Sequence, residues 1–170
     1  MDPVVRRSRG TRDWRRTRPG TTEGAAQVDE SSVRAVGWAR SLPMSSDVKA
    51  ARDWSRERLK VLGWTETAPQ TVDAVLLTVS ELVTNAHVHA HSNAQLVLTW
   101  DTRCLHVAVH DASHHLPTPR PPSAERLGGR GILLVDALAD SWEARPCPYG
   151  KTVVACFRPP DVSGPDGRRS

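Results

Sequence analysis

The chain has 170 residues, of which 38% are hydrophobic and 25% are charged, and its formal net charge is +4. This length is typical of one domain that buries roughly two-thirds of its unfolded surface. No apolar run approaches the roughly 18 residues of a membrane helix, and none follows the charged start, so we expect neither a membrane span nor a secretory signal. We therefore place the chain in the cytoplasm.

The positive charge is concentrated at the N-terminus. Residues 1–23 hold seven arginines and three acidic residues, which accounts for the whole net charge of +4 and leaves the rest near neutral. Residues 1–32 have few periodic apolar positions, so we expect a disordered basic tail there and a second disordered tail over residues 159–170. Arginines around Trp14 could bind phosphates and stack a base. A solvated tail is commoner, so we do not favour nucleic acid as a partner.

The folded domain is expected over residues 33–158. The stretch Val33–Leu42 is rich enough in β-formers to be a first strand, and Pro43 after it favours an edge position. Asp47 can cap a helix whose apolar face begins at Val48 and which stops at Gly63. The first two elements are thus predicted to be an edge strand and an amphipathic helix.

The most informative stretch is Thr71–Ala90. Its apolar residues form one stripe at helical spacing: Val72, Val75, Leu76, Val79, Leu82, Val83, Ala86 and Ala90. Thr67 and Gln70 could form a capping box, and Pro69 suits a first helical turn. We therefore predict a helix from about Pro69 to about His89.

An acid and a carboxamide lie on this helix away from the apolar stripe. Glu81 and Asn85 are four residues apart, so they are neighbours one turn apart on one face. Such a pair could accept a proton and coordinate a hard cation through oxygen, as a magnesium nucleotide site requires. The alternative is two solvated helix residues, which is commoner when the pair is considered alone.

The second half of the chain alternates between strands and one short helix. Gln95–Trp100 and the residues from Leu105 to Val109 alternate as the two strands of a hairpin. Residues 112–127 contain four prolines and no periodicity, which favours a lid. A short helix from about Ile132 follows, and residues 141–145 and 151–157 are predicted strands around a turn at 146–150.

Two motifs in this half could bind a nucleotide. Gly128-Gly129-Arg130-Gly131 opens the short helix, where free backbone N–H groups can bind an anion; a flexible turn is the alternative. The sequence holds neither a P-loop nor a GxGxxG after a strand. Asp111 ends an alternating strand, where its carboxylate could accept a hydrogen bond from an adenine amino group or cap a turn.

Other polar residues carry weaker signals. His87 and His91 share a helical face only if the helix extends that far, and the sequence places no third ligand, so a histidine metal site is not favoured. The simplest interpretation of His114 and His115 is that they are exposed residues of the lid. The three cysteines, Cys104, Cys147 and Cys156, form no CxxC, so we expect small buried or half-buried residues rather than a disulfide framework or a zinc site.

The order of these motifs is similar to that of a known superfamily. SELVTNAHVHA, then VAVHD, a loop, GGRGILLV and a closing GKT resemble the GHKL ATPases, and specifically the histidine-kinase-like ATPase domain of the bacterial anti-sigma factor / serine-protein kinase group. The resemblance covers about residues 35–158. It implies an α+β fold, a two-layer α/β sandwich with a mixed, mainly antiparallel sheet and helices on one face.

The resemblance also implies site residues. Asn85 matches the asparagine that holds Mg²⁺, and Glu81 matches the acid that acts as general base. Asp111 matches the aspartate that binds the adenine amino group. Matches to the ATP phosphate and base contacts are Gly129, Arg130, Gly131 and Thr152. On this basis the chain is expected to bind ATP with Mg²⁺.

The function implied is that of an anti-sigma factor with serine/threonine kinase activity toward an anti-anti-sigma partner, with a sigma factor as a further partner and a homodimer left open. One departure is visible, because Ser113 and His115 stand where the family pattern has glycines after the strand aspartate. The alternative is a nucleotide-dependent protein-binding switch that transfers no phosphate.

Overall fold

The computed structural model describes residues 5–8, 35–118 and 130–159. Its elements follow in chain order: β1 (Val5–Ser8), β2 (Val36–Leu42), α1 (Val48–Val61), α2 (Trp64–Thr67), α3 (Pro69–Thr84), the π-helical turn η1 (Asn85–His89), β3 (Ala94–Trp100), β4 (Leu105–Asp111), α4 (Arg130–Leu138), β5 (Ser141–Cys147) and β6 (Gly150–Phe157). None of the described helices combines the length and the hydropathy needed to span a membrane.

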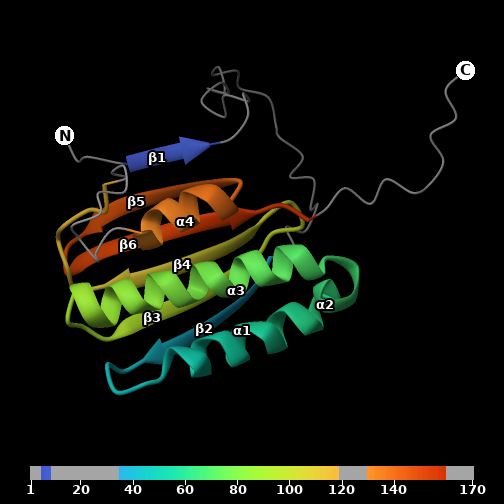
Figure 1. The fold of residues 1–170 in the computed structure, drawn as a ribbon, viewed down its shortest axis with the longest axis horizontal. Coiled ribbons are helices and arrows are strands. Elements are labelled where there is room, and N and C mark those ends of the chain that lie inside the picture. Colours follow the sequence, from blue (N-terminus) through green and yellow to red (C-terminus); the bar gives the residue numbers. More distant parts are fainter. Residues whose placement is uncertain (1–4, 9–34, 119–129, 160–170) are drawn as a thin grey trace, which may run out of the picture.

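The strands form one sheet of six, in the order β1-β5-β6-β4-β3-β2. The helices cover one face of this sheet, with α1 and α3 side by side and α4 beside β5 and β6 (Figure 1). The predicted two-layer α+β fold is confirmed. Every pairing among the described strands is antiparallel, so the mixed character that we expected of the sheet does not appear.

One edge strand of the sheet was predicted from the sequence and the other was not. Among the described strands β2 pairs only with β3, which confirms an edge strand before Pro43. At the other edge, Val5–Ser8 pairs with β5, although the sequence predicted no structure within residues 1–32. The edge of β5 offers unpaired backbone N–H and C=O groups to any extended segment. Pairing of this kind depends little on side-chain pattern, which explains why the composition did not predict it.

The core lies between the helical layer and the inner face of the sheet. In β4, Leu105, Val107 and Val109 are buried, and the residues between them are half-buried. The same alternation runs along β3 and β6, so the three central strands present one apolar face to α3. Burying each side chain of this size contributes roughly 1.5–3 kcal/mol before entropy is counted.

α3 is the central helix of the molecule, as predicted. It begins at Pro69, and its apolar stripe is buried from Val72 to Val83. The predicted capping box is wrong, because a short helix that the pattern did not reveal, α2, precedes α3. In α2 the hydroxyl of Thr67 donates to the carbonyl of Gly63, and the α3 N-cap, Ala68, has no side-chain bond.

The other predicted elements are confirmed within a few residues. α1 has Asp47 as its N-cap, with the carboxylate accepting from the backbone N–H of Lys49 at 2.9 Å. The β3–β4 hairpin turns at Asp101, as expected. The predicted lid falls mainly outside the described residues, which include only its beginning, residues 112–118.

Candidate functional site

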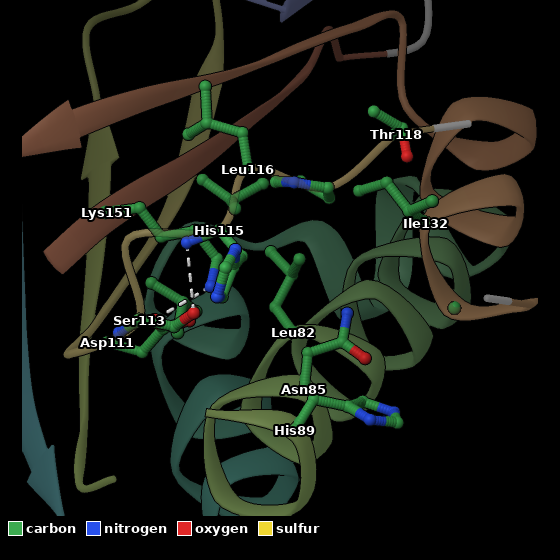
Figure 2. Close-up of a pocket in the computed structure, with 14 residues that line it drawn as sticks. Leu82, Asn85, His89, Asp111, Ser113, His115, Leu116, Thr118, Ile132 and Lys151 are labelled. Carbon is green, nitrogen blue, oxygen red and sulfur yellow. Dashed lines mark hydrogen bonds and ion pairs between the residues drawn. The ribbon is translucent and has the colours of Figure 1, made fainter. Parts of the chain in front are cut away.

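A cavity of about 380 Å³ opens at the end of α3, and its size suits a small organic ligand. Its floor is apolar, from Leu82, Val109, Ile132 and Val153. Polar side chains reach it from η1, from the end of β4 and the start of β6, and from the segment 113–118, while Gly131 and Ile132 line it from the start of α4 (Figure 2). An apolar cavity with a few convergent polar groups is the usual form of a ligand site.

The acid and the carboxamide of the central helix lie close to Gly131, the second residue of α4. A Cβ built on Gly131 would lie 2.6 Å from Glu81 Oε2, 3.4 Å from Asn85 Oδ1 and 3.5 Å from Asn85 Nδ2. Asn85 and Gly131 line the cavity, while Glu81 stands at its margin beside them. The three residues that the sequence singled out are therefore brought together, and a side chain at position 131 would require the flexible Glu81 carboxylate to shift.

The helix changes its winding at Asn85. Residues Asn85–His89 form a π-helical turn, in which the backbone N–H of Ala90 donates to the carbonyl of Asn85 at 3.0 Å. Such turns are rare and occur often at functional sites, because the wider winding shifts side chains relative to a regular helix. The predicted helix end near His89 is confirmed, although its last turn is not α-helical.

The strand aspartate lies in the cavity and is paired with a lysine. Asp111 is 3% exposed, and its Oδ1 accepts from Lys151 Nζ at 2.9 Å and from the backbone N–H of Ser113 at 2.8 Å. Lys151 comes from the neighbouring strand β6, directly opposite Asp111 in the register. A lone buried carboxylate would be costly, so Lys151 balances the charge of Asp111 (Figure 2).

Thr152 occupies a different place from the one expected of an adenine contact. Side chains alternate along β6, so Lys151 and Val153 line the cavity and Thr152 lies on the opposite face of the sheet. Its hydroxyl is 3.3 Å from His110 Nδ1 and 3.4 Å from Cys147 Sγ. Thr152 was predicted to help hold adenine, whereas the β6 residue that lies opposite Asp111 and lines the cavity is Lys151.

The remaining predicted residues are only partly described. Gly129 lies outside the described residues, and Arg130 begins α4 with a side chain that the structure does not describe. Ser113 and His115, which stand at the usual glycine positions, both line the cavity. His115 is exposed, as predicted, and is also part of the cavity wall.

Comparison with known proteins decides the family. The family model described as "Histidine kinase-like ATPase domain" matches residues 44–157, about two-thirds of the chain. This chain belongs to the histidine kinase-like ATPase domain family. No curated protein matches it.

A solved structure agrees with the fold of this ATPase domain. It contains the RsbU and RsbW domains of Rv1364c from Mycobacterium tuberculosis, and the match has a TM-score of 0.55 with 15% sequence identity. The match covers 72% of the present chain and 32% of that one. The ATPase domain therefore spans about a third of its solved neighbour, and at this identity the likeness concerns the fold alone.

Lys151 is a charged cavity residue of this ATPase domain that sequence analysis missed. It precedes Val153, Ala155 and Phe157 at a spacing of two, so the alternation of β6 places it on the buried face. A lysine on an apolar strand face needs a buried partner. That signal was present in the sequence and would have predicted a nearby carboxylate.

The cysteines of the ATPase domain also differ from expectation. Cys104 and Cys156 form a disulfide, with Cα atoms 5.9 Å apart, whereas the spacing favoured no disulfide; Cys147 is free. The two residues lie 52 positions apart, and only the pairing of β4 with β6 brings them together. The burial prediction is confirmed, because Cys104 is buried and the other two are half-buried.

Proposed function

We propose that this ATPase domain binds ATP with Mg²⁺ in the cavity at the end of α3. The observation that carries the proposal is the meeting of Glu81 and Asn85 with Gly131, beside an apolar slot that ends in Asp111. Because Gly131 has no side chain, its backbone lies close to these two oxygen-bearing side chains, and a glycine at the start of a helix lets backbone N–H groups approach a phosphate. The donor types suit a hard cation.

In this proposal the residues have distinct tasks. Asn85 would hold Mg²⁺, which when bound neutralises phosphate charge. The backbone at Gly129, Arg130 and Gly131 would hold phosphates. Asp111 would accept a hydrogen bond from the adenine amino group. Because Asp111 Oδ1 already accepts from Lys151, adenine would share this carboxylate with the lysine. Thr152 has no task here, since its hydroxyl lies on the other face of the sheet.

We further propose that the domain is an anti-sigma factor with serine/threonine kinase activity toward an anti-anti-sigma partner in the cytoplasm. The motif resemblance and the RsbW domain of the solved neighbour support this choice. Glu81 would take the proton of the partner's serine or threonine hydroxyl. The hydroxyl oxygen would bond to the γ-phosphorus of ATP as the bond to ADP breaks. A sigma factor would be a second protein partner.

A second candidate is a nucleotide-dependent binding switch that transfers no phosphate. Ser113 and His115 favour it, because they bring side chains into the cavity at places where the family pattern has glycines. These side chains would hinder tight closure of the segment over the phosphates. Binding of ATP without transfer to any partner of the anti-anti-sigma class would support the switch.

Asn85→Ala tests the nucleotide site. In the presence of Mg²⁺ we expect the variant to bind ATP at least about tenfold more weakly, or about 1.4 kcal/mol, because an oxygen ligand of the metal is lost. With a chelator in place of Mg²⁺, the affinities of variant and parent should converge. Isothermal titration calorimetry measures both.

Gln95→Ala is the matched control, since it removes a carboxamide from the other face of the sheet, where Gln95 Nε2 donates to Ser41 Oγ. This variant should bind Mg–ATP as the parent does. Equal Mg²⁺-dependent affinities for Asn85→Ala and the parent would remove Asn85 from the site.

A further inference from the structure

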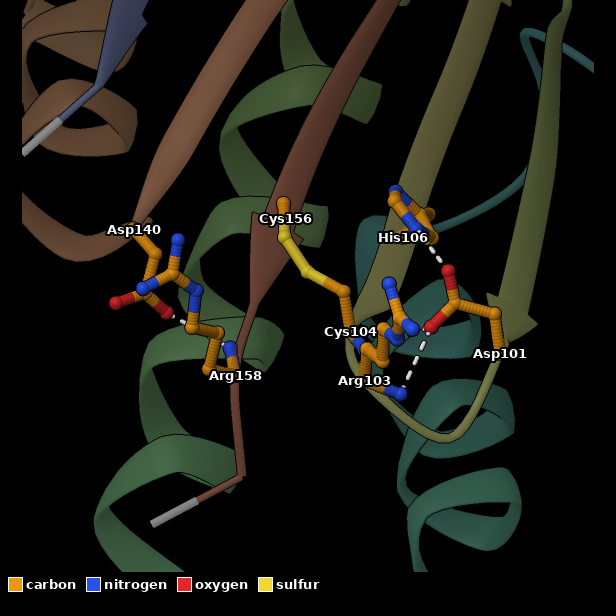
Figure 3. Close-up of a disulfide and its surroundings, with 7 residues drawn as sticks. All are labelled: Asp101, Arg103, Cys104, His106, Asp140, Cys156 and Arg158. Carbon is orange, nitrogen blue, oxygen red and sulfur yellow. Dashed lines mark hydrogen bonds and ion pairs between the residues drawn. A yellow bond between two sulfur atoms is a disulfide. The ribbon is translucent and has the colours of Figure 1, made fainter. Parts of the chain in front are cut away.

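Cys104, His106 and Cys156 form a cluster on the sheet face that the helices leave open. His106 and Cys156 are register partners on β4 and β6 at half-buried positions that alternate with the buried core residues, and Cys104 immediately precedes β4. Figure 3 shows the disulfide that joins β6 to the start of β4, with the His106–Asp101 contact nearby. The cluster is separate from the cavity residues.

Once the disulfide is reduced, this cluster has the composition of a metal site. One ligand atom from each of Cys104, His106 and Cys156 lies within 4.8 Å of the other two. Tetrahedral Zn²⁺ has Zn–S distances of about 2.3 Å and Zn–N distances of about 2.0 Å, which puts its ligands roughly 3.5 Å apart. Two thiols released from a disulfide need only small side-chain rotations to reach such separations.

Asp101 already holds the histidine as a metal ligand would be held. Its Oδ2 accepts from His106 Nε2 at 3.1 Å, and its Oδ1 accepts the backbone N–H groups of Arg103 at 2.9 Å and Cys104 at 2.8 Å. A carboxylate that fixes one ring nitrogen leaves the other, Nδ1, for a metal.

We propose that Cys104, His106 and Cys156 bind a thiophilic divalent cation of the Zn²⁺ class in the reduced chain, and that disulfide formation expels it. The side chain of His106 is 36% exposed, so a metal can reach the cluster and a water can complete four-coordination. Two thiolates and one imidazole match the softness that Zn²⁺ prefers.

The redox step balances with a hydroperoxide as the oxidant. The S–S bond forms as the O–O bond of hydrogen peroxide breaks; the two thiolates lose two electrons, the peroxide takes these with two protons to give two waters, and the cation leaves as Zn²⁺. In the reverse direction a dithiol reductant is oxidised to its own disulfide and restores both thiols. Reducing compartments keep most cysteines as thiols, which is the metal-binding form.

The cluster is independent of the proposed nucleotide function. Along β4, Asp111 is five residues from His106, a separation of about 17 Å, and its side chain lies on the opposite face of the sheet. Metal binding can therefore be tested whether or not the chain binds ATP.

Co²⁺ is the probe, because thiolate ligands give it an intense near-ultraviolet charge-transfer band and tetrahedral ligands give it visible bands. The full chain, reduced and freed of metal, should take up one equivalent with both sets of bands. His106→Gln and Cys104→Ser should weaken uptake at least about tenfold. Cys147→Ser and His110→Gln are the controls, since they remove a thiol and an imidazole outside the cluster, and should bind Co²⁺ as the parent does.

Hydrogen peroxide tests the switch. One treatment of the Co²⁺-loaded parent should release the metal and reduce the three free thiols of the chain to one, assigned to Cys147 by alkylation and mass spectrometry. The proposal is overturned if the reduced parent gives no charge-transfer band, or if His106→Gln, whose partly exposed side chain can change without unfolding, leaves affinity and bands unaltered. Metal retained after the Cys104–Cys156 disulfide has formed overturns the switch.

Discussion

Glu81→Gln is expected to leave ATP affinity near that of the parent and to lower phosphate transfer to an anti-anti-sigma partner at least about 100-fold. The amide keeps the shape of the side chain beside Gly131 but cannot accept the proton of the attacking hydroxyl. Transfer is measured with ATP labelled at the γ-phosphate, and affinity by calorimetry on the same preparations.

Asp73→Asn is the matched control for this variant, because Asp73 is an exposed acid near the start of α3, more than two turns from Glu81. It should transfer phosphate at the parent's rate. Undiminished transfer by Glu81→Gln would contradict the assignment of Glu81 as the base. A parent that binds ATP and transfers to no such partner would instead support the binding switch.

Gly150→Ala is expected to cost roughly 3–5 kcal/mol of the free energy of unfolding. Gly150 begins β6 with φ of +144°, and a Cβ there would overlap the carbonyl oxygen of Asp111 and lie 2.8 Å from Ala112 Cα. Both obstacles are backbone, so the strand must move away from β4. The melting temperature should fall on the order of 10 °C, as circular dichroism will measure.

Gly37→Ala provides the comparison, since its Cβ would meet nothing closer than 3.8 Å and its φ is not in the positive range. This variant should melt near the parent temperature. If Gly150→Ala melted there too, the close approach of β6 to the end of β4 would not be a constraint on the fold.

The elements that could be predicted are those whose pattern is long and local. The stripe on α3 and the alternation in the β3–β4 hairpin each follow from a repeated spacing, and both appear where expected. The capping-box prediction at Thr67 was wrong because four residues are too few to show a helical period, so α2 was not visible. Pairing of β1 with β5 uses backbone groups, which carry no sequence signal.

The site was predictable where it depended on helical geometry. Glu81 and Asn85 had to lie on one face, and the structure brings that face to Gly131. Predictions that depended on which face of the sheet a strand residue occupies were less accurate, because a shift of one residue moves a side chain to the other face. This is why Lys151, and not Thr152, accompanies Asp111.

Contacts between strands that are distant in the chain could not be predicted from the sequence. Cys104 and Cys156 meet only because β4 pairs with β6 in one particular register. Neither spacing nor composition fixes that register, so the disulfide and its neighbour His106 could not be predicted together. The Asp101 turn, by contrast, is local and was expected.

The central claim is that the cavity at the end of α3 binds ATP with Mg²⁺, and calorimetric titration of the full parent chain with ATP tests it most directly. With Mg²⁺ we predict a single site per chain, and with a chelator in its place a clearly weaker one. No heat of binding at millimolar ATP in the presence of Mg²⁺ would contradict the account.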